Sequence, residues 1–293
     1  MSAAAATWIA ADWGTTHLRV WAMSDSGTVL AAAGSADGMG TLTRDGFAPA
    51  LDARTADWPA VPVIACGMVG SRQGWTEAPY SAVPCPALAS NLTLAGTRCH
   101  IIPGLKQASP ADVMRGEETQ IAGFLSLNPR WDGVICLPGT HTKWVHVSAD
   151  EVVSFQTVMT GDLFAAITGH TVLRHSCTDG WDDAGFLQGV DDAITRPEKL
   201  AARLFSLRAE GLLNDLPNAT ARARLSGLLI GAELAATKPY WLGQQIAVIG
   251  AGTLAGLYVT ALGAQAAPAT QVNADRATLA GLTAAYRSWK DQT

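Results

Sequence analysis

Apolar residues gather in short blocks along this chain, and the blocks predict a mixed α/β protein. Trp8–Gly14 and Leu18–Met23 are strand-like, and the short turn Gly14–His17 between them predicts a β-hairpin, followed by a further strand over 28–33. The same form returns over Val134–Val147, about 125 residues later. Because a strand, a Gly/Thr turn and a strand occur twice, we expect a duplicated α/β unit.

Longer periodic stretches predict the remaining elements. Helices are expected over 117–127, 163–168, 197–210, 222–237, 254–262 and 274–290, and strands over 61–66, 152–158 and 246–252. The acidic residues Asp179, Asp182 and Asp183 are interpreted as an exposed loop. We expect an N-terminal lobe over 1–125 and a C-terminal lobe over 126–273, with a terminal helix over 274–291 that packs back on the first lobe.

Composition and charge narrow the class of protein. Hydrophobic residues make up 48% of the chain and charged residues 15%, which is typical of a globular protein with a core. The net charge is −5 without a run of Lys or Arg, so neither a nucleic acid nor a membrane is expected as a partner. The five cysteines form no CxxC pair and the start of the chain has no signal-peptide pattern, which favours a cytoplasmic protein with free thiols. The oligomeric state stays open, a homodimer included.

The first turn carries candidate chemistry. Asp12 ends a buried strand and is followed by Gly14, Thr15 and Thr16. A carboxylate at this position can hold hydrated Mg²⁺, and the small residues after it can offer N–H and hydroxyl groups to a phosphate. Such a string alone is also compatible with a plain hairpin turn.

Two later strings repeat this chemistry. The second turn contains Gly139, Thr140, Thr142 and the basic residue Lys143, which again suit a phosphate. The third string, with Gly250, Gly252 and Thr253 between a strand and a helix start, is a candidate nucleotide site. It also fits a dinucleotide fingerprint of Gly250, Gly252 and Ala255 with Asp275 as the acidic residue. Only 18 residues follow Asp275, too few for the rest of such a fold.

In this order the three strings resemble the phosphate-1, phosphate-2 and adenosine motifs of the actin-like ATPase fold. That resemblance implies a duplicated ribonuclease H-like fold, with two lobes and a nucleotide cleft between them. More narrowly, the chain resembles the 2-dehydro-3-deoxygalactonokinase family. The strings that carry this resemblance are Ala11-Asp-Trp-Gly-Thr-Thr16, Gly67-Met-Val-Gly-Ser-Arg-Gln-Gly-Trp75, Met114-Arg-Gly-Glu-Glu-Thr-Gln120, Leu137-Pro-Gly-Thr-His-Thr-Lys-Trp144 and Met159-Thr-Gly-Asp162.

The resemblance implies a kinase that uses ATP and Mg²⁺ to phosphorylate the 6-hydroxyl of 2-dehydro-3-deoxy-D-galactonate, a small sugar acid, in galactonate catabolism. Related kinases place a catalytic carboxylate at a helix start before the second phosphate turn, and Glu117 occupies that position here. Glu118 and Asp162 are alternative bases and otherwise substrate-binding candidates, although Asp162 stands where the family is expected to carry Glu.

The remaining candidates concern charge and substrate. Lys143 would stabilise charge on the transferred phosphoryl group. Arg72 and Arg115 could grip the carboxylate of the acid, and Trp75 could form a wall of its site. Two other classes stay open: an NAD(P)-dependent oxidoreductase that uses the Gly250–Asp275 segment, and a nucleotide-binding sensor of the same fold without turnover.

Overall fold

The computed structural model describes residues 3–250 and 252–292, which divide into two compact units. Unit 1 comprises the first segment of the chain up to Asp132, the segment Val147–Ser154 and the last segment from Asn273. Unit 2 comprises Gly133–His146 and Phe155–Val272. Each unit contains β-sheet and helices, as the sequence predicts for an α/β protein. None of the helices in the described ranges is both long and apolar enough to span a membrane.

Unit 1 is built on a six-stranded sheet. In spatial order its strands are β3 (Val29–Ser35), β2 (Leu18–Met23), β1 (Trp8–Trp13), β4 (Val63–Gly67), β8 (Cys99–Ile101) and β7 (Thr93–Ala95). The predicted hairpin is confirmed, because β1 and β2 pair antiparallel, and β4 pairs parallel with the other side of β1. This register sets Asp12 directly between Arg19 on β2 and Cys66 on β4.

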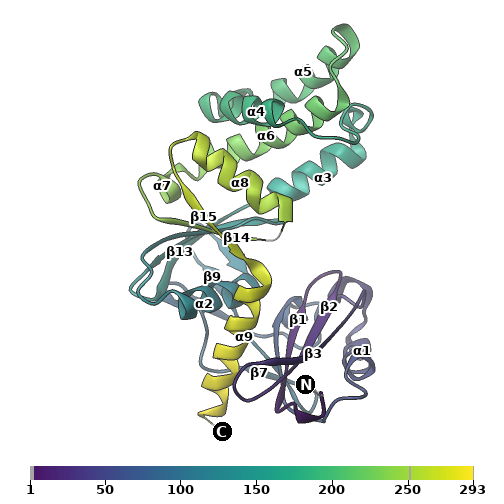
Figure 1. The fold of residues 1–293 in the computed structure, drawn as a ribbon, viewed down its shortest axis with the longest axis vertical. Coiled ribbons are helices and arrows are strands. Elements are labelled where there is room, and N and C mark those ends of the chain that lie inside the picture. The colour runs from purple at the N-terminus through teal and green to yellow at the C-terminus, as the bar shows by residue number, and fades with distance from the viewer. Residues whose placement is uncertain (1–2, 251, 293) are drawn as a thin grey trace. The chain divides into compact units, whose positions relative to one another are not determined.

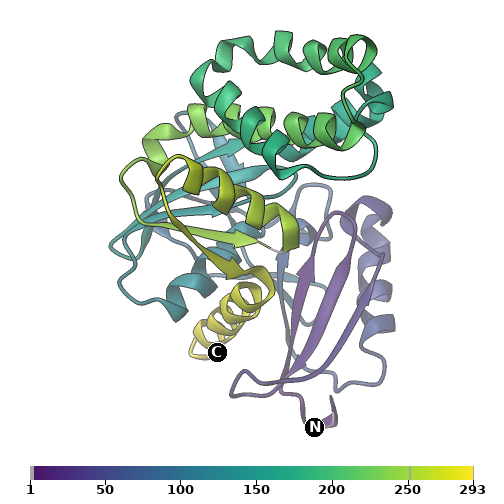
Figure 2. The ribbon, with the colours of Figure 1, turned by 45° about the horizontal axis from the view of Figure 1, so that its top comes forward.

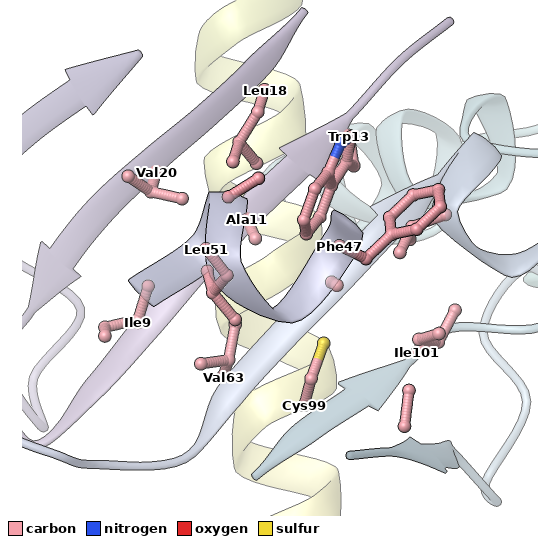
Figure 3. Close-up of a cluster of buried hydrophobic side chains, with 14 of the residues drawn as sticks. Ile9, Ala11, Trp13, Leu18, Val20, Phe47, Leu51, Val63, Cys99 and Ile101 are labelled. Carbon is pink, nitrogen blue, oxygen red and sulfur yellow. The ribbon is translucent and has the colours of Figure 1, made fainter. Parts of the chain in front are cut away.

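Helices cover both faces of this sheet. Side chains alternate along β1, so Ile9, Ala11 and Trp13 join Phe47 and Leu51 of α1 (Phe47–Arg54) in one buried cluster. Figure 3 shows this cluster, with α1 lying over the labelled strand residues. On the opposite face, Trp8 and Ala10 pack against α9 (Ala274–Lys290), where the ring of Trp8 stacks on Tyr286 at 4.5 Å between centroids.

Helix α2 (Glu117–Leu127) packs closely on α9, and both helices have the bounds that the sequence predicts. A Cβ on Gly123 of α2 would lie 1.8 Å from the carbonyl oxygen of Ala277 on α9, and one on Gly281 would lie 1.9 Å from that of Thr119. Two glycines therefore allow the helices to cross almost backbone to backbone.

Short strands complete unit 1. A three-stranded sheet holds β10 (Asp112–Met114), β9 (Gly104–Gln107) and β5 (Tyr80–Ala82) in this order, and β6 (Cys85–Pro86) pairs with the first residues of β13 (Glu151–Val158). Single 3-10 turns lie at Ala3–Ala5, Met39–Thr41, Arg44–Gly46 and Met68–Gly70.

Unit 2 contains the second sheet and most of the helices. Its strands, in spatial order, are β15 (Ala269–Asn273), β14 (Ile246–Gly250), β11 (Gly133–Leu137), β12 (Thr142–Ser148) and β13. Its helices are α3 (Thr160–His170), α4 (Asp183–Thr195), α5 (Leu200–Leu213), α6 (Asn218–Ala236), α7 (Lys238–Trp241) and α8 (Gly252–Ala264), with 3-10 turns at Val172–His175 and Pro197–Lys199. Helices α3 to α6 gather at one end of this unit, as Figures 1 and 2 show.

One expectation for this unit is wrong. The acidic segment around Asp182 and Asp183 is not simply an exposed loop, because it starts α4. The Asp182 carboxylate accepts hydrogen bonds from the N–H groups of Ala184 and Gly185, at 3.0 and 3.1 Å. Asp182 is therefore the N-cap of a helix that the sequence analysis did not include.

Candidate active site

The first Gly/Thr turn of unit 1 presents Asp12 at the end of β1. Its Oδ2 accepts a hydrogen bond of 2.5 Å from Arg19, which also contacts Asp275 at the start of α9. The turn itself is closed by the Gly14 N–H, which donates to the His17 carbonyl. Asp12 is thus held in one orientation while remaining partly exposed.

A neighbouring loop supports this turn from behind. The N–H of Gly40 donates to the Thr15 carbonyl at 2.8 Å, and a Cβ on Gly38 would lie 2.3 Å from the same oxygen. The side chains of Thr15 and Thr16 lie on the exposed side of the turn, where the Thr16 hydroxyl contacts the His17 ring.

The start of α2 carries two adjacent carboxylates in different environments. Gly116 precedes the helix with φ of 108°, a conformation that favours glycine. Glu117 is half-buried, and its Oε2 accepts from the Arg115 N–H at 3.1 Å. Glu118 is fully buried and accepts from the Gly116 N–H and the Thr119 hydroxyl. Burial, together with the nearby charge of Glu117, raises the pKa of Glu118 to about 8.

A cavity of about 190 Å³ in unit 1 joins these features. Four predicted residues line it, namely Asp12, Gly14, Arg115 and Glu117, together with Cys66, Gly67, Met68, Gly116, Gln120 and Thr278. Two carboxylates, one guanidinium and a glycine turn thus meet around one hollow. Glu117 is the more accessible of the two carboxylates at this helix start, which favours Glu117 over Glu118 as a group that touches a ligand.

Arg115 is held rigidly beside this cavity. Its guanidinium lies 4.2 Å from the centre of the Tyr80 ring, and its Nη2 donates to the Ala78 carbonyl at 2.7 Å. The side chain is buried, yet its Nη1 has no hydrogen-bond partner within the described parts of the chain. A buried donor without a partner is costly. This atom faces the interior, because a Cβ on Gly70 would lie 2.9 Å from it.

The other predicted substrate residues of unit 1 lie apart from this cavity. Arg72 is 82% exposed and lies 3.7 Å from Glu77. Trp75 contributes its ring to the core, where it contacts Trp13 and Phe47. The sequence pattern does not distinguish Arg72 and Trp75 from Arg115 as substrate-binding residues, because all three lie in loops.

The second Gly/Thr turn, between β11 and β12, rests on the start of α3. A Cβ on Gly161 would lie 2.4 Å from the Gly139 carbonyl oxygen, and the Asp162 N–H donates to the Thr140 carbonyl at 3.0 Å. The Asp162 carboxylate contacts the His141 ring at 2.7 Å. Asp162 therefore takes part in shaping this turn.

Two other predicted residues of the second turn point inward. The Thr142 hydroxyl contacts that of Tyr258 at 2.9 Å in the interior. The Lys143 side chain is also buried, and its Nζ donates to the His141 carbonyl at 3.3 Å. The alternation of side chains along β12 accounts for the position of Thr142, which is its first residue.

A second cavity, of about 340 Å³, lies within unit 2 beside this turn. Predicted residues Gly139 and Thr253 line it, and most of its wall is apolar. Gly250 ends β14 and Gly252 begins α8, whereas Ala251 lies outside the described residues. The remaining lining residues are Thr160, Gly161, Phe164, Trp181, Arg222, Ser226, Leu229, Ile230, Leu254, Leu257 and Tyr258.

The sequence analysis did not include most of these wall residues. Phe164, Trp181, Arg222 and Ser226 come from several different elements of unit 2 and carry no motif. Phe164, Arg222 and Ser226 show only the periodicity of a packed helix, and Trp181 lies in the loop before α4. By contrast, Gly67 in the first cavity does belong to a quoted family string.

The dinucleotide interpretation is wrong. Asp275, its acidic residue, belongs to unit 1 and pairs with Arg19 at 2.6 Å, whereas Gly250 and Gly252 belong to unit 2. The glycines of the Gly250–Asp275 segment and the acidic residue that would bind the ribose of a dinucleotide therefore belong to different units.

The chain has the actin-like ATPase fold, which it shares with a solved structure that is 10% identical to it and superposes with a TM-score of 0.51. A profile of the family described as 2-keto-3-deoxy-galactonokinase matches residues 12–285. The chain therefore belongs to the 2-keto-3-deoxy-galactonokinase family and is a sugar-acid kinase.

Individual relatives agree with this family. The chain is 40% identical to a probable 2-dehydro-3-deoxygalactonokinase of Rhizobium meliloti, over 95% of this chain and 96% of the relative. It is 36% identical to the 2-dehydro-3-deoxygalactonokinase of Escherichia coli, over 94% of this chain and 96% of the relative. A crystal structure from Sinorhizobium meliloti that bears the same enzyme name superposes with a TM-score of 0.90 at 39% identity, over 96% and 98% of the two chains.

Proposed function

We propose that this kinase transfers the γ-phosphate of ATP to the 6-hydroxyl of 2-dehydro-3-deoxy-D-galactonate. The observation that carries the proposal is the first cavity, where Asp12, Glu117 and Arg115 face one hollow in unit 1. The two curated relatives bear the name of this activity, which supports the choice of acceptor. Unit 1 supplies the acceptor side of the reaction and unit 2 supplies the nucleotide side, as the two lobes of the enzyme.

In this proposal Glu117 accepts the proton of the attacking hydroxyl. The carboxylate is half-buried at a helix start and lines the same cavity as Asp12. A base in this position orients the hydroxyl and removes its proton as the bond to phosphorus forms. Glu118 is the weaker candidate, because its carboxylate is buried and its oxygens already accept hydrogen bonds from Gly116 and Thr119.

Arg115 is proposed to bind the carboxylate of the acid. Arg115 lines the first cavity, and the contacts to Tyr80 and Ala78 fix the plane of its guanidinium. A guanidinium can bind a carboxylate with charge-assisted hydrogen bonds. This fixed anchor would hold the hydroxyl at the other end of the acid near Glu117.

Asp12 would hold Mg²⁺ through water or directly. A magnesium ion in a kinase usually binds one or two carboxylates, several waters and the nucleotide phosphates. No cluster of three or more His, Cys, Asp or Glu suited to a metal occurs in the part of the chain that the structure describes, and a single carboxylate fits this sparse coordination. When bound, the ion neutralises charge on the phosphates.

The nucleotide is assigned to the second cavity. Its volume of about 340 Å³ and apolar walls suit a nucleobase, and Gly139 and Thr253 on its rim suit phosphate and sugar oxygens. The exposed hydroxyls of Thr15 and Thr16 and the turn at Thr140 remain candidates for phosphate contacts.

The five free cysteines support a reducing, cytoplasmic compartment.

The test is ADP release in a coupled assay, with ATP and Mg²⁺ against three acids. These are 2-dehydro-3-deoxygalactonate, its gluconate epimer and galactonate. Turnover with the first acid alone supports the proposal, and turnover with another acid changes the substrate but keeps the kinase. Tight ATP binding without turnover on any acid would instead support the sensor. A Glu77→Gln variant, altered at an exposed carboxylate, is the matched surface control.

A further inference from the structure

Unit 2 contains a buried carboxylate that no step of the proposed reaction uses. Glu233 lies on α6 and is 1% exposed. Its Oε1 accepts from the Trp144 indole at 2.7 Å, and its Oε2 accepts from the Tyr258 hydroxyl at 2.7 Å and from the Thr160 hydroxyl. One side chain thus joins α6 to β12, α8 and α3.

This arrangement is costly for stability alone. Burial raises the pKa of Glu233, although the hydrogen bonds from Thr160, Tyr258 and Trp144 oppose that shift. Burying an ionisable group is unfavourable, and well-packed apolar residues often serve stability at least as well. The presence of a carboxylate here therefore favours a role other than core packing.

The partners of Glu233 flank the second Gly/Thr turn. Thr160 is the first residue of α3, and the next two residues of that helix hold the turn through Gly139 and Thr140. On the other side of the turn, Tyr258 contacts Thr142, which begins β12. One carboxylate therefore anchors both flanks of the turn.

The same residues also form the wall of the second cavity. Thr160 and Tyr258 line it, together with Gly139 and Gly161. Glu233 itself lies behind this wall, because it is buried and reaches the cavity through these two side chains.

We propose that Glu233 is a positioning residue that fixes the Gly139–Thr140 turn and the start of α3 against the nucleotide cavity, and so sets the affinity for ATP. This inference rests on the proposed assignment of that cavity to the nucleotide. It predicts an effect on ATP that is separate from any effect on the sugar acid, because the acceptor residues belong to unit 1.

Glu233→Gln and Glu233→Leu separate geometry from charge. The glutamine oxygen can accept from Trp144, and its amide group can donate to the hydroxyls of Thr160 and Tyr258, which can also act as acceptors. Glu233→Gln should therefore keep the KM for ATP within about threefold. Glu233→Leu removes the acceptor shared by three buried donors, and the KM for ATP should rise at least about tenfold, which corresponds to about 1.4 kcal/mol.

Tyr258→Phe and Thr160→Val keep the test decisive if Glu233→Leu does not fold. Each removes one hydroxyl from the network with little change of shape, and each should raise the KM for ATP about three- to tenfold. The KM for the sugar acid should stay unchanged in both variants. Leu51→Ala, a buried change on α1 in a cluster that shares no residue with either cavity, is the control for lost stability, and it should leave both KM values unchanged.

The measurements are the KM for each substrate and calorimetric binding of a non-hydrolysable ATP analogue, all on the full chain. Weaker analogue binding in Tyr258→Phe and Thr160→Val, with binding kept in Glu233→Gln and in Leu51→Ala, is the expected result. Binding equal to the wild type in both hydroxyl variants would overturn the inference while leaving the kinase proposal intact. A wild-type chain that binds no analogue would overturn the nucleotide assignment itself.

Discussion

Arg19 Nη2 lies 2.5 Å from Oδ2 of Asp12, across the β1–β2 ladder in which the two residues are direct partners. The same guanidinium reaches Asp275 at the start of α9 through Nη1, at 2.6 Å. The hairpin therefore also orients the candidate site, because Arg19 on its second strand holds the Asp12 carboxylate near the end of its first strand.

We expect Asp12→Asn to lower kcat by about 10²-fold or more, because the Asp12 carboxylate is proposed to hold the Mg²⁺ ion that neutralises charge on the phosphates. The concentration of Mg²⁺ needed for half-maximal rate should rise as well. Arg19→Gln should have a smaller effect, about tenfold, because it frees the carboxylate without removing it. Asp275→Asn, on the far side of Arg19, is the control and should stay close to the wild type. A wild-type rate and Mg²⁺ dependence in Asp12→Asn would contradict the role of Asp12.

Glu117→Gln should lower kcat by about 10²- to 10⁴-fold, the usual loss when a general base is removed. Glu118→Gln should keep most of the activity near pH 7, because the pKa of Glu118 is raised to about 8 and glutamine imitates the protonated acid. Steady-state rates with saturating ATP and acid compare the two variants directly. If Glu118→Gln is inactive and Glu117→Gln is active, the general base is Glu118 and the role proposed for Glu117 is contradicted.

The stability of the protein should fall as pH rises through the range in which Glu118 loses its proton. Its pKa is near 4.5 in an unfolded chain and about 8 in the folded protein, so the folded state binds more protons between these values. The contribution of the neutral carboxyl is complete below pH 4.5 and is lost as pH approaches 8.

Thermal unfolding between pH 5 and pH 9 measures this effect. Glu118→Gln should have a weaker dependence of Tm on pH and should be more stable than the wild type at the alkaline end. Glu77→Gln, which changes an exposed carboxylate, should follow the wild-type curve. Parallel curves for the wild type and Glu118→Gln would show that Glu118 titrates normally.

Filling the second cavity should block the nucleotide. Ser226 is buried on α6 and lines this cavity, so Ser226→Phe should raise the KM for ATP more than about tenfold without changing the KM for the acid. Ser206→Phe, at an exposed position on α5, is the control for a new aromatic residue. An unchanged KM for ATP in folded Ser226→Phe would place the nucleobase elsewhere.

The sequence predicts the parts of this fold that have strong local signals. The bounds of α2 and α9 match, since each helix has a clear start at Gly116 or Asn273 and a long helical pattern. Helix α4 was missed because its cap, Asp182, belongs to an acidic segment that is also typical of a solvated loop. The predicted helix over 197–210 is found as a 3-10 turn followed by α5, which extends to Leu213.

The candidate site was predictable only as far as turns and spacing allow. The glycines and the acidic residues Asp12 and Glu117 stand in recognisable strings, and the structure brings them to one cavity of unit 1. The direction of a side chain is a property of packing, which is why Thr142 and Trp75 could not be assigned to the interior in advance. The walls of the second cavity depend on how α3, α6 and α8 of unit 2 meet, and no local signal reports that.

The most direct test of the central claim is the identity of the phosphorylated product. Purified protein, ATP, Mg²⁺ and 2-dehydro-3-deoxygalactonate should give one phosphate monoester, measured by proton-coupled ³¹P NMR. The account predicts a phosphorus signal split by the methylene protons of C6, with ADP formed in equal amount and no ester from Glu117→Gln on the same time scale. A signal split by a single proton would place the phosphate on a secondary hydroxyl, and inorganic phosphate alone would contradict the transfer to the acid.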